Sequence, residues 1–220
     1  MTRLQPMDFQ ALQPKLIAIL RGVRPEEIGD IVDGLLDAGF RAIETPLNSP
    51  DPFRSIEIAV ERAAAAGVGP CLIGAGTVLR VEEVARVVAA GGNLVVSPNT
   101  DAAVIEATVA AGLVSIPGCY TATEALLALR AGAHALKFFP ASVLGAGGIR
   151  AIAAVLPPKS PLVAVGGVSD SDFAAYRQAG VEGFGLGSSL YKPGDAAGDV
   201  IARGRAAIAA YGGGPDHRPD

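Results

Sequence analysis

The chain has 220 residues, of which 50% are hydrophobic and 18% are charged, and its formal net charge is −4. This length and composition predict one domain with a sizeable hydrophobic core. The acidic balance excludes the broad basic surface with which proteins bind nucleic acids or anionic membranes. No apolar run approaches the ~18 residues that cross a bilayer. We therefore expect a chain without a nucleic-acid or membrane partner, which binds any anionic ligand through local loops.

The predicted elements alternate regularly along the chain. After the first apolar run, Pro25 opens a helix that carries Glu26 and Glu27 in its first turn and apolar residues at helical spacing. Later helical stretches end in Ala-Gly, a common helix stop, and each is followed by another apolar run of strand length. The predicted strands are 16–21, 42–47, 71–78, 94–99, 114–118, 135–140, 162–168 and 184–190.

This alternation predicts an α/β fold. Near-continuous apolar strands separated by helices are typical of a parallel sheet covered by helices. Eight such units in about 200 residues favour a (β/α)8 TIM barrel, a single domain over residues 1–211. A doubly wound open sheet is the structural alternative, but no GxGxxG motif opens the first helix. The stretch 212–220 is rich in glycine and proline, and we expect a disordered tail.

Cysteine and histidine are too scarce to predict a disulfide framework or a metal site. Cys71 and Cys119 are the only cysteines and both lie in apolar stretches. Because no signal-peptide pattern opens the chain, we expect a reduced, cytoplasmic setting. His134 and His217 are the only histidines, and neither belongs to a cluster with metal-ligand spacing. No metal is therefore expected.

In a barrel of this kind, functional side chains lie at the C-terminal ends of the strands. Two glycine motifs, VGGV and LGSS, fall on the seventh and eighth predicted strands, where barrels commonly bind phosphate through bare backbone amides. Either motif alone is compatible with a tight turn, but both together favour a phosphate site. The polar and small residues at the predicted strand ends are Arg21, Glu44, Asn48, Thr77, Ser97, Pro98, Asn99, Lys137, Gly166, Gly167, Gly187, Ser188 and Ser189.

Lys137 is the one lysine embedded in a predicted strand. Lys15, Lys159 and Lys192 each adjoin a proline in a connection, where we expect them to be solvated. An amine attacks a ketone only when unprotonated, which requires its pKa to fall from ~10.4 to about 7 or 8. Burial beside Phe139, together with a nearby cation, could lower the pKa in this way.

The residues alone leave two hypotheses for this lysine. It is either a nucleophile or the buried partner of an ion pair with Glu44. Glu44 is correspondingly a counter-ion, a proton carrier or both. Arg21 presents a planar fork of donors that suits a substrate carboxylate, although a solvated loop arginine is the simpler alternative.

The chain resembles the family of 2-keto-3-deoxy-6-phosphogluconate aldolases and their 6-phosphogalactonate relatives. The resemblance runs from Leu16 to Tyr191, and its motifs come in the family's order: AILRG, IETPLNSP, IGAGTV, SPN, IPGCYTATEAL, ALKFFP, AVGGV and GLGSSLY.

The resemblance implies a cofactor-free class I aldolase, a cytoplasmic homotrimer that cleaves a phosphorylated keto-deoxy sugar acid into pyruvate and glyceraldehyde 3-phosphate. Lys137 then matches the family's Schiff-base lysine and Glu44 its general acid/base. The other implied contacts are Arg21, Thr77, Pro98, Phe139 and Val165 for the substrate, and Gly166, Gly167, Gly187 and Ser188 for the phosphate.

Two positions bear on the substrate epimer. Members that act on the gluconate form typically carry arginine four residues after the glutamate and threonine before the glycine pair, whereas this chain has Asn48 and Val165. Both choices resemble the galactonate branch. A valine lacks the hydroxyl that could bond a substrate oxygen, and such a difference can discriminate strongly between substrates. A gluconate-specific aldolase and a non-catalytic phosphosugar-binding barrel remain the alternatives.

Overall fold

The computed structural model describes residue 4 and residues 7–213. The strands are β1 (Leu16–Ile19), β2 (Ala42–Pro46), β3 (Leu72–Gly76), β4 (Leu94–Val96), β5 (Val114–Ile116), β6 (Gly118–Cys119), β7 (Leu136–Phe138), β8 (Leu162–Val165) and β9 (Gly183–Leu186). The α-helices are α1 (Pro25–Ala38), α2 (Pro52–Ala65), α3 (Val81–Ala89), α4 (Ala102–Ala110), α5 (Ala122–Arg130), α6 (Ala141–Ala153), α7 (Phe173–Arg177) and α8 (Ala197–Gly212). Two 3₁₀ turns, η1 (Phe9–Ala11) and η2 (Asp170–Asp172), complete the described elements.

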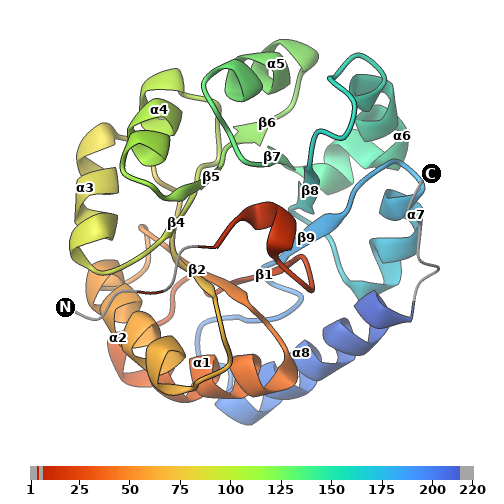
Figure 1. The fold of residues 1–220 in the computed structure, drawn as a ribbon. Helices are drawn as coiled ribbons and strands as arrows, with labels where there is room; N and C mark the ends of the chain where they lie inside the picture. The colour runs from red at the N-terminus through yellow and green to blue at the C-terminus, as the bar shows by residue number, and fades with distance from the viewer. Residues whose placement is uncertain (1–3, 5–6, 214–220) are drawn as a thin grey trace.

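The strands form one parallel sheet that curves into a barrel, with the helices in an outer ring (Figure 1). The strand order is β5-β4-β3-β2-β1-β9-β8-β7-β6, so the two ends of the sheet are β5 and β6. These two are consecutive in the chain and separated only by Pro117. The chain itself therefore joins the ends of the sheet, which confirms the predicted (β/α)8 barrel and excludes the open sheet.

The predicted fifth strand, 114–118, is divided in the structure. Pro117 has no N–H and cannot donate to the ladder, which ends β5 and separates it from β6. His134 spans this interruption, since its backbone N–H donates to the Ser115 carbonyl at 2.9 Å. In return, the Ser115 N–H donates to His134 Nδ1 at 3.1 Å. The histidine is thus part of the barrel seam.

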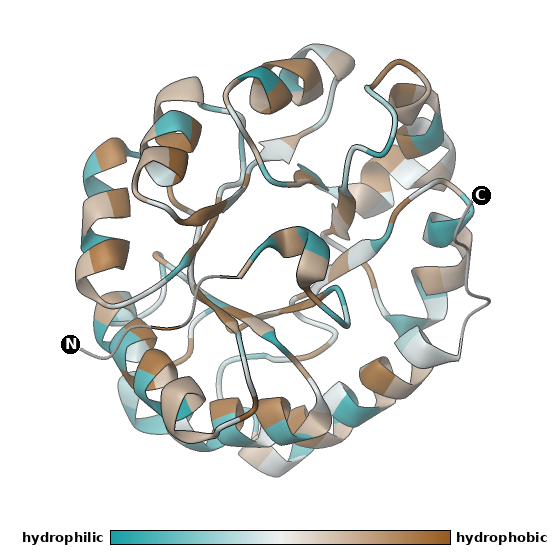
Figure 2. Ribbon diagram, viewed as in Figure 1, coloured by the Kyte–Doolittle hydropathy of each residue, from teal (hydrophilic) through white to brown (hydrophobic). Residues whose placement is uncertain are grey.

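Alternate residues of each strand point to opposite sides of the sheet, and they build two cores. The inner core fills the barrel and includes Ile17, Leu72 and Val163. The outer core lies between sheet and helices. Figure 2 shows the corresponding alternation of hydrophobic and hydrophilic residues along the helices, whose apolar sides cover the sheet.

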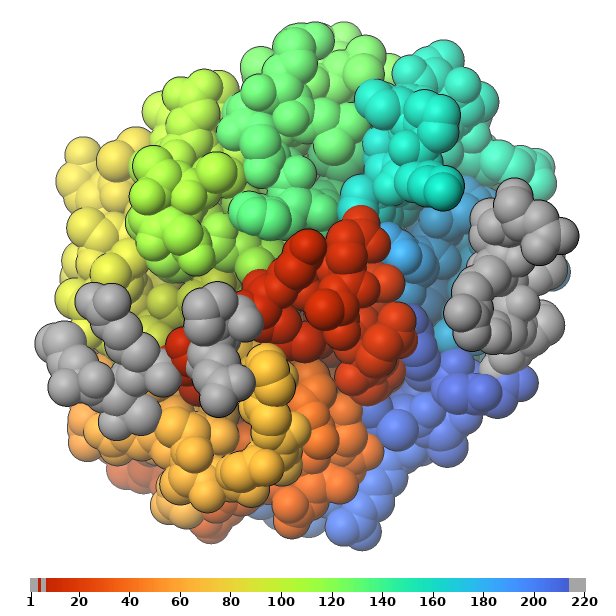
Figure 3. Space-filling view, in the orientation of Figure 1, coloured from red at the N-terminus to blue at the C-terminus, as the bar shows by residue number. Residues whose placement is uncertain are grey.

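The segment before β1 closes one end of the barrel. Phe9 and Leu12 are fully buried and belong to the inner core. Asp8 caps the η1 turn by accepting the Gln10 N–H, and η1 lies across the centre of the barrel (Figure 3). This end adjoins the start of β1, so the opposite end, where the strands finish, is the one left for a site.

The described residues contain no helix long and apolar enough to span a bilayer. The last helix, α8, includes Gly212, with which the predicted tail begins. The remainder of that tail, from residue 214, lies outside the described residues.

Candidate active site

The two strand-borne charges point into the barrel. Ala42 and Ala135 belong to the inner core, and Glu44 and Lys137 follow each of them by two residues. A period of two places both charged side chains on the same inner side, one layer nearer to the C-terminal ends of the strands. Only 3% of Glu44 and 6% of Lys137 are exposed. The barrel thus holds an amine and a carboxylate together in its mouth, the apolar opening at the C-terminal ends of the strands.

Burial lowers the pKa of Lys137 to about 8, because desolvation penalises the ammonium form. The negative charge of Glu44 opposes this shift, and the positive charge of Arg21 reinforces it. The ammonium nitrogen also lies 5.0 Å from the centre of the Phe139 ring. A pKa near 8 leaves an appreciable fraction of neutral amine at physiological pH, which attack on a ketone requires.

Glu44 is shifted in the complementary direction. Burial raises its pKa to about 7, although the cations Lys137 and Arg21 both favour the carboxylate form. Its Oε2 is buried without a hydrogen-bond partner, and the described residues contain no ion pair between it and Lys137. The structure therefore does not support the simple ion-pair hypothesis. A carboxyl group that titrates near neutral pH can both accept and donate a proton.

Gly76, which sequence reasoning missed, makes room for this carboxyl group. A Cβ at position 76 would lie 1.8 Å from Glu44 Oε2. Glycine at the end of β3 is thus what lets the Glu44 side chain lie against the neighbouring strand. The strand register pairs Glu44 with Gly74 and Pro46 with Gly76, so the Glu44 side chain reaches past its own partner to the next glycine on the same face of β3.

The guanidinium of Arg21 is held by two neighbouring loops. Nη1 donates to Asn48 Oδ1 at 2.6 Å and Nη2 to Thr77 Oγ1 at 3.4 Å. Thr77 has a φ of 59°, an uncommon conformation for a β-branched residue, and such strain often accompanies functional sites. The structure thus brings together Arg21 and Thr77, as predicted, with Asn48 as an additional partner.

The wall next to Lys137 is formed by tightly packed backbone. Gly118 pairs with Lys137 across β6 and β7. A Cβ at Gly118 would lie 2.2 Å from the Pro98 carbonyl oxygen, which places the predicted contact residue Pro98 against this wall. Cys119 is buried, its thiol lies 3.7 Å from the Lys137 carbonyl oxygen, and burial raises its pKa to about 12. The thiol therefore acts here as a packing group, as expected.

The glycine loops follow two adjacent strands. Val165 pairs with Gly185, so Gly167 and Gly187 each lie two residues beyond that pair. Gly166 and Gly167 have φ values of 92° and 69°, which favour glycine. Gly167 is exposed at this rim, and Gly166 and Gly187 are half-buried.

Further side chains flank these loops. A Cβ at Gly166 would lie 3.0 Å from the Phe139 ring, which connects the loop to the lysine. The hydroxyl of Ser142, a residue that sequence reasoning missed, faces Gly167, where an added Cβ would lie 2.4 Å from it. Ser188 is exposed at the end of β9, and Gly187 has open space around its Cα.

Lys15 contradicts the prediction of a solvated lysine. It is only 6% exposed and forms an ion pair of 3.1 Å with Glu182. Its ammonium nitrogen lies 6.0 Å from the centre of the Phe9 ring, at the closed end of the barrel, where Glu182 precedes the first residue of β9.

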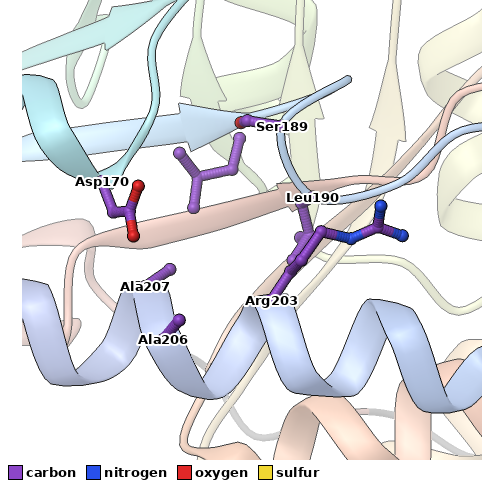
Figure 4. A pocket seen from close by; sticks show the side chains of 7 residues that line it. Asp170, Ser189, Leu190, Arg203, Ala206 and Ala207 are labelled. Atoms are coloured by element: carbon purple, nitrogen blue, oxygen red, sulfur yellow. The ribbon is translucent and has the colours of Figure 1, made fainter.

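A surface pocket lies away from these residues, between α8 and β9 on the outside of the barrel (Figure 4). Its lining residues are Asp170, Leu186, Ser189, Leu190, Arg203, Ala206 and Ala207. Of the residues at the predicted strand ends, Ser189 lines this pocket, whereas the residues assigned to catalysis, substrate and phosphate do not. Within residue 4 and residues 7–213, no group of three histidine, cysteine or acidic side chains is arranged to hold a metal ion.

Comparisons with known proteins show the family to which the chain belongs. Residues 8–201 match the family model for KDPG and KHG aldolase. The chain is 58% identical over 208 residues to a protein of Rhizobium meliloti (strain 1021), named probable 2-dehydro-3-deoxy-6-phosphogalactonate aldolase, with 93% of this chain and 96% of the relative covered. A protein of Escherichia coli (strain K12) named 2-dehydro-3-deoxy-6-phosphogalactonate aldolase is 45% identical, with 93% and 98% covered.

A solved structure described as native KDPGal is 44% identical and superimposes with a TM-score of 0.88, covering 93% of this chain and 97% of that one.

The buried lysine predicts a gain in stability when its charge is removed. We expect Lys137→Met to raise the free energy of unfolding at pH 7 by about 1–3 kcal/mol, because the folded state no longer desolvates an ammonium group. Denaturant titration measures this change. Lys192→Met, at an exposed position, is the control and should stay within about 0.5 kcal/mol of wild type.

The same shift has a pH signature. Because the folded pKa lies near 8 and the unfolded one near ~10.4, the unfolded state binds more protons between these values, so wild-type stability should gain from this group as pH rises across them. The Met variant lacks this contribution. Equal stability of the two proteins at pH 7 would show that the ammonium form is not penalised by burial.

Proposed function

Since the chain belongs to the KDPG and KHG aldolase family, we propose that it is a Schiff-base aldolase for 2-dehydro-3-deoxy-6-phospho-D-galactonate. Its products are pyruvate and D-glyceraldehyde 3-phosphate, and the reaction is reversible. The observation that carries the proposal is the pairing of a buried lysine whose pKa is lowered with a buried glutamate whose pKa is raised. Such opposite shifts support the assignment of Lys137 as an amine nucleophile and Glu44 as a proton carrier near neutral pH.

The first half of the reaction forms the imine. Neutral Lys137 attacks the carbon 2 ketone, and the carbinolamine loses water to give an iminium ion. Glu44 protonates the carbonyl oxygen, accepts a proton from the attacking nitrogen and returns it to the departing hydroxyl, so it ends this half of the reaction as a carboxylate. The Oε2 of Glu44 suits this exchange, because it has no hydrogen-bond partner among residue 4 and residues 7–213.

The second half breaks the bond between carbons 3 and 4. Glu44, directly or through a water, takes the proton of the carbon 4 hydroxyl, and the electrons of the breaking bond flow into the iminium ion. Glyceraldehyde 3-phosphate leaves as the aldehyde, and an enamine of pyruvate stays on Lys137. Protonation at carbon 3 and hydrolysis of the resulting imine release pyruvate and restore the amine.

Both charged ends of the substrate have a partner at the rim. Arg21, with Thr77 beside it, binds the carboxylate, while the glycine loops after β8 and β9 bind the phosphate through backbone amides. Ser188 adds a hydroxyl donor to the phosphate. Two fixed ends hold the reacting bond over Lys137, so phosphate binding contributes to the chemistry at a distance.

The preference for the galactonate epimer is supported by Val165. This residue ends β8 inside the barrel, immediately before the glycine pair, and offers only methyl groups to the substrate. The relatives from Rhizobium meliloti and Escherichia coli that bear the galactonate name are 58% and 45% identical to this chain. A preference for the gluconate epimer is the alternative.

We also propose a homotrimer in the cytoplasm, as the family resemblance implies. Leu79, Val81 and Tyr120 expose apolar surface after β3, at the start of α3 and after β6, a position that suits an interface between copies. Light scattering would give a mass of three chains. A cytoplasmic location suits a substrate with two anionic groups, which does not cross a bilayer unaided.

The Schiff base is directly testable. Incubation with pyruvate followed by borohydride should attach one reduced pyruvyl group to Lys137, as located by mass spectrometry of peptides. Lys137→Ala should give no adduct and lose cleavage by at least about 10³-fold, since the nucleophile is absent. A folded wild-type protein without adduct would instead favour a non-catalytic phosphosugar-binding barrel.

The epimer preference can be measured as kcat/KM on the two phosphorylated acids. We expect wild type to prefer the galactonate form. Val165→Thr should shift the ratio toward the gluconate form by roughly tenfold, because it restores one hydroxyl bond. Val155→Thr, at a position 61% exposed outside the barrel, should leave the ratio unchanged. A wild-type preference for the gluconate form would refute the assignment.

A further inference from the structure

The side chain of Asn48 is directed at the guanidinium of Arg21, not at the mouth residues Glu44 and Lys137. Its amide oxygen accepts the Nη1 proton of Arg21 at 2.6 Å, the shorter of the two hydrogen bonds that hold this arginine. In the second, Arg21 Nη2 donates to the Thr77 hydroxyl at 3.4 Å. Arg21 itself is exposed. The two acceptors therefore supply the restraint that burial would otherwise give to a long, flexible side chain.

The next residue fixes the backbone of the same segment. Ser49 is only 7% exposed, and its hydroxyl accepts the Gly22 N–H at 2.8 Å. The Ser49 N–H in turn donates to the Pro46 carbonyl at the end of β2. Two consecutive residues after β2 thus hold both the tip of Arg21 and the backbone beside it. This arrangement ties the arginine to the strand that carries Glu44.

Both groups that hold the guanidinium are neutral. An amide oxygen and a hydroxyl orient Arg21 without cancelling its charge, and the described residues contain no ion pair to it. That charge acts on the groups inside the mouth. The groups that act electrostatically on Lys137 are Glu44 from β2, Cys119 from β6 and Arg21 after β1, and only Arg21 disfavours the ammonium form.

We propose that Asn48 is a positioning residue, which aims the Arg21 guanidinium at the carboxylate of the substrate while leaving its positive charge uncompensated. The proposal rests on the proposed function, since it takes the pyruvyl carboxylate as the group that Arg21 binds. It assigns to Asn48 a task at the carboxylate end of the substrate, apart from any influence on the choice of epimer.

Two substitutions separate orientation from charge. Asn48→Ala removes the acceptor but leaves the arginine charge unchanged. We expect the pyruvate concentration for half-maximal borohydride trapping to rise roughly tenfold, with an unchanged pH midpoint of trapping. Asn48→Asp keeps an acceptor but adds a negative charge. It should shift the pH midpoint upward, since a cancelled Arg21 charge no longer disfavours the ammonium form of Lys137.

The controls exclude a merely structural effect. Pyruvamide, the neutral analogue of pyruvate, should be trapped equally by wild type and Asn48→Ala, because it lacks the carboxylate that Arg21 binds. Gln10→Glu makes the same change of amide to acid at the closed end of the barrel. It should alter neither the pyruvate concentration for half-maximal trapping nor the pH midpoint of trapping. Circular dichroism at each pH verifies that the variants are folded.

The outcomes are distinct. If wild type forms the Lys137 adduct while both Asn48 variants retain its pyruvate dependence and pH midpoint, the role of Asn48 is overturned and the aldolase proposal stands. Equal losses with pyruvate and pyruvamide would also overturn that role. A wild type that forms no adduct would overturn both proposals.

Discussion

The burial of one ammonium group and one carboxyl group in the mouth of the barrel is the constraint on which the rest of the site depends. Desolvation alone moves the pKa of Lys137 down and that of Glu44 up, toward each other and toward neutrality. A direct ion pair would have moved both values apart again. The strands keep the two groups on one inner face without joining them, and Gly76 supplies the space in which the carboxyl group lies.

The need to bury these two groups also decides which end of the barrel carries the site. The η1 turn inserts Phe9 and Leu12 into one end, so water is excluded there and the apolar layers of the interior are complete. The charged layer can then occupy only the opposite end, where the backbone opens into the glycine loops. Rigid strands hold the groups that react, whereas loops hold the groups that bind, as is typical of this architecture.

The sequence predicts the barrel well because hydrophobic runs, helix stops and a count of eight units are local signals. The break at Pro117 was missed because apolar runs do not reveal where a ladder loses a donor. Lys15 was misassigned because its partner, Glu182, is distant in sequence. For Lys137 and Glu44, residue types and spacing are compatible both with an ion pair and with catalysis, because they do not give the distance between the two side chains. Family resemblance gave them roles, while Gly76, Ser142 and the contact of Asn48 required coordinates.

The charge of Arg21 connects binding to chemistry. A substrate carboxylate brought next to Lys137 would by itself stabilise the ammonium form and so suppress the nucleophile that the reaction needs. If Arg21 were already paired with a protein carboxylate, it could not offset this stabilisation of the ammonium form. Holding it with an amide and a hydroxyl keeps the full charge free until the substrate arrives. The carboxylate then pairs with the arginine, and the two together present little net charge to the lysine as the ketone approaches.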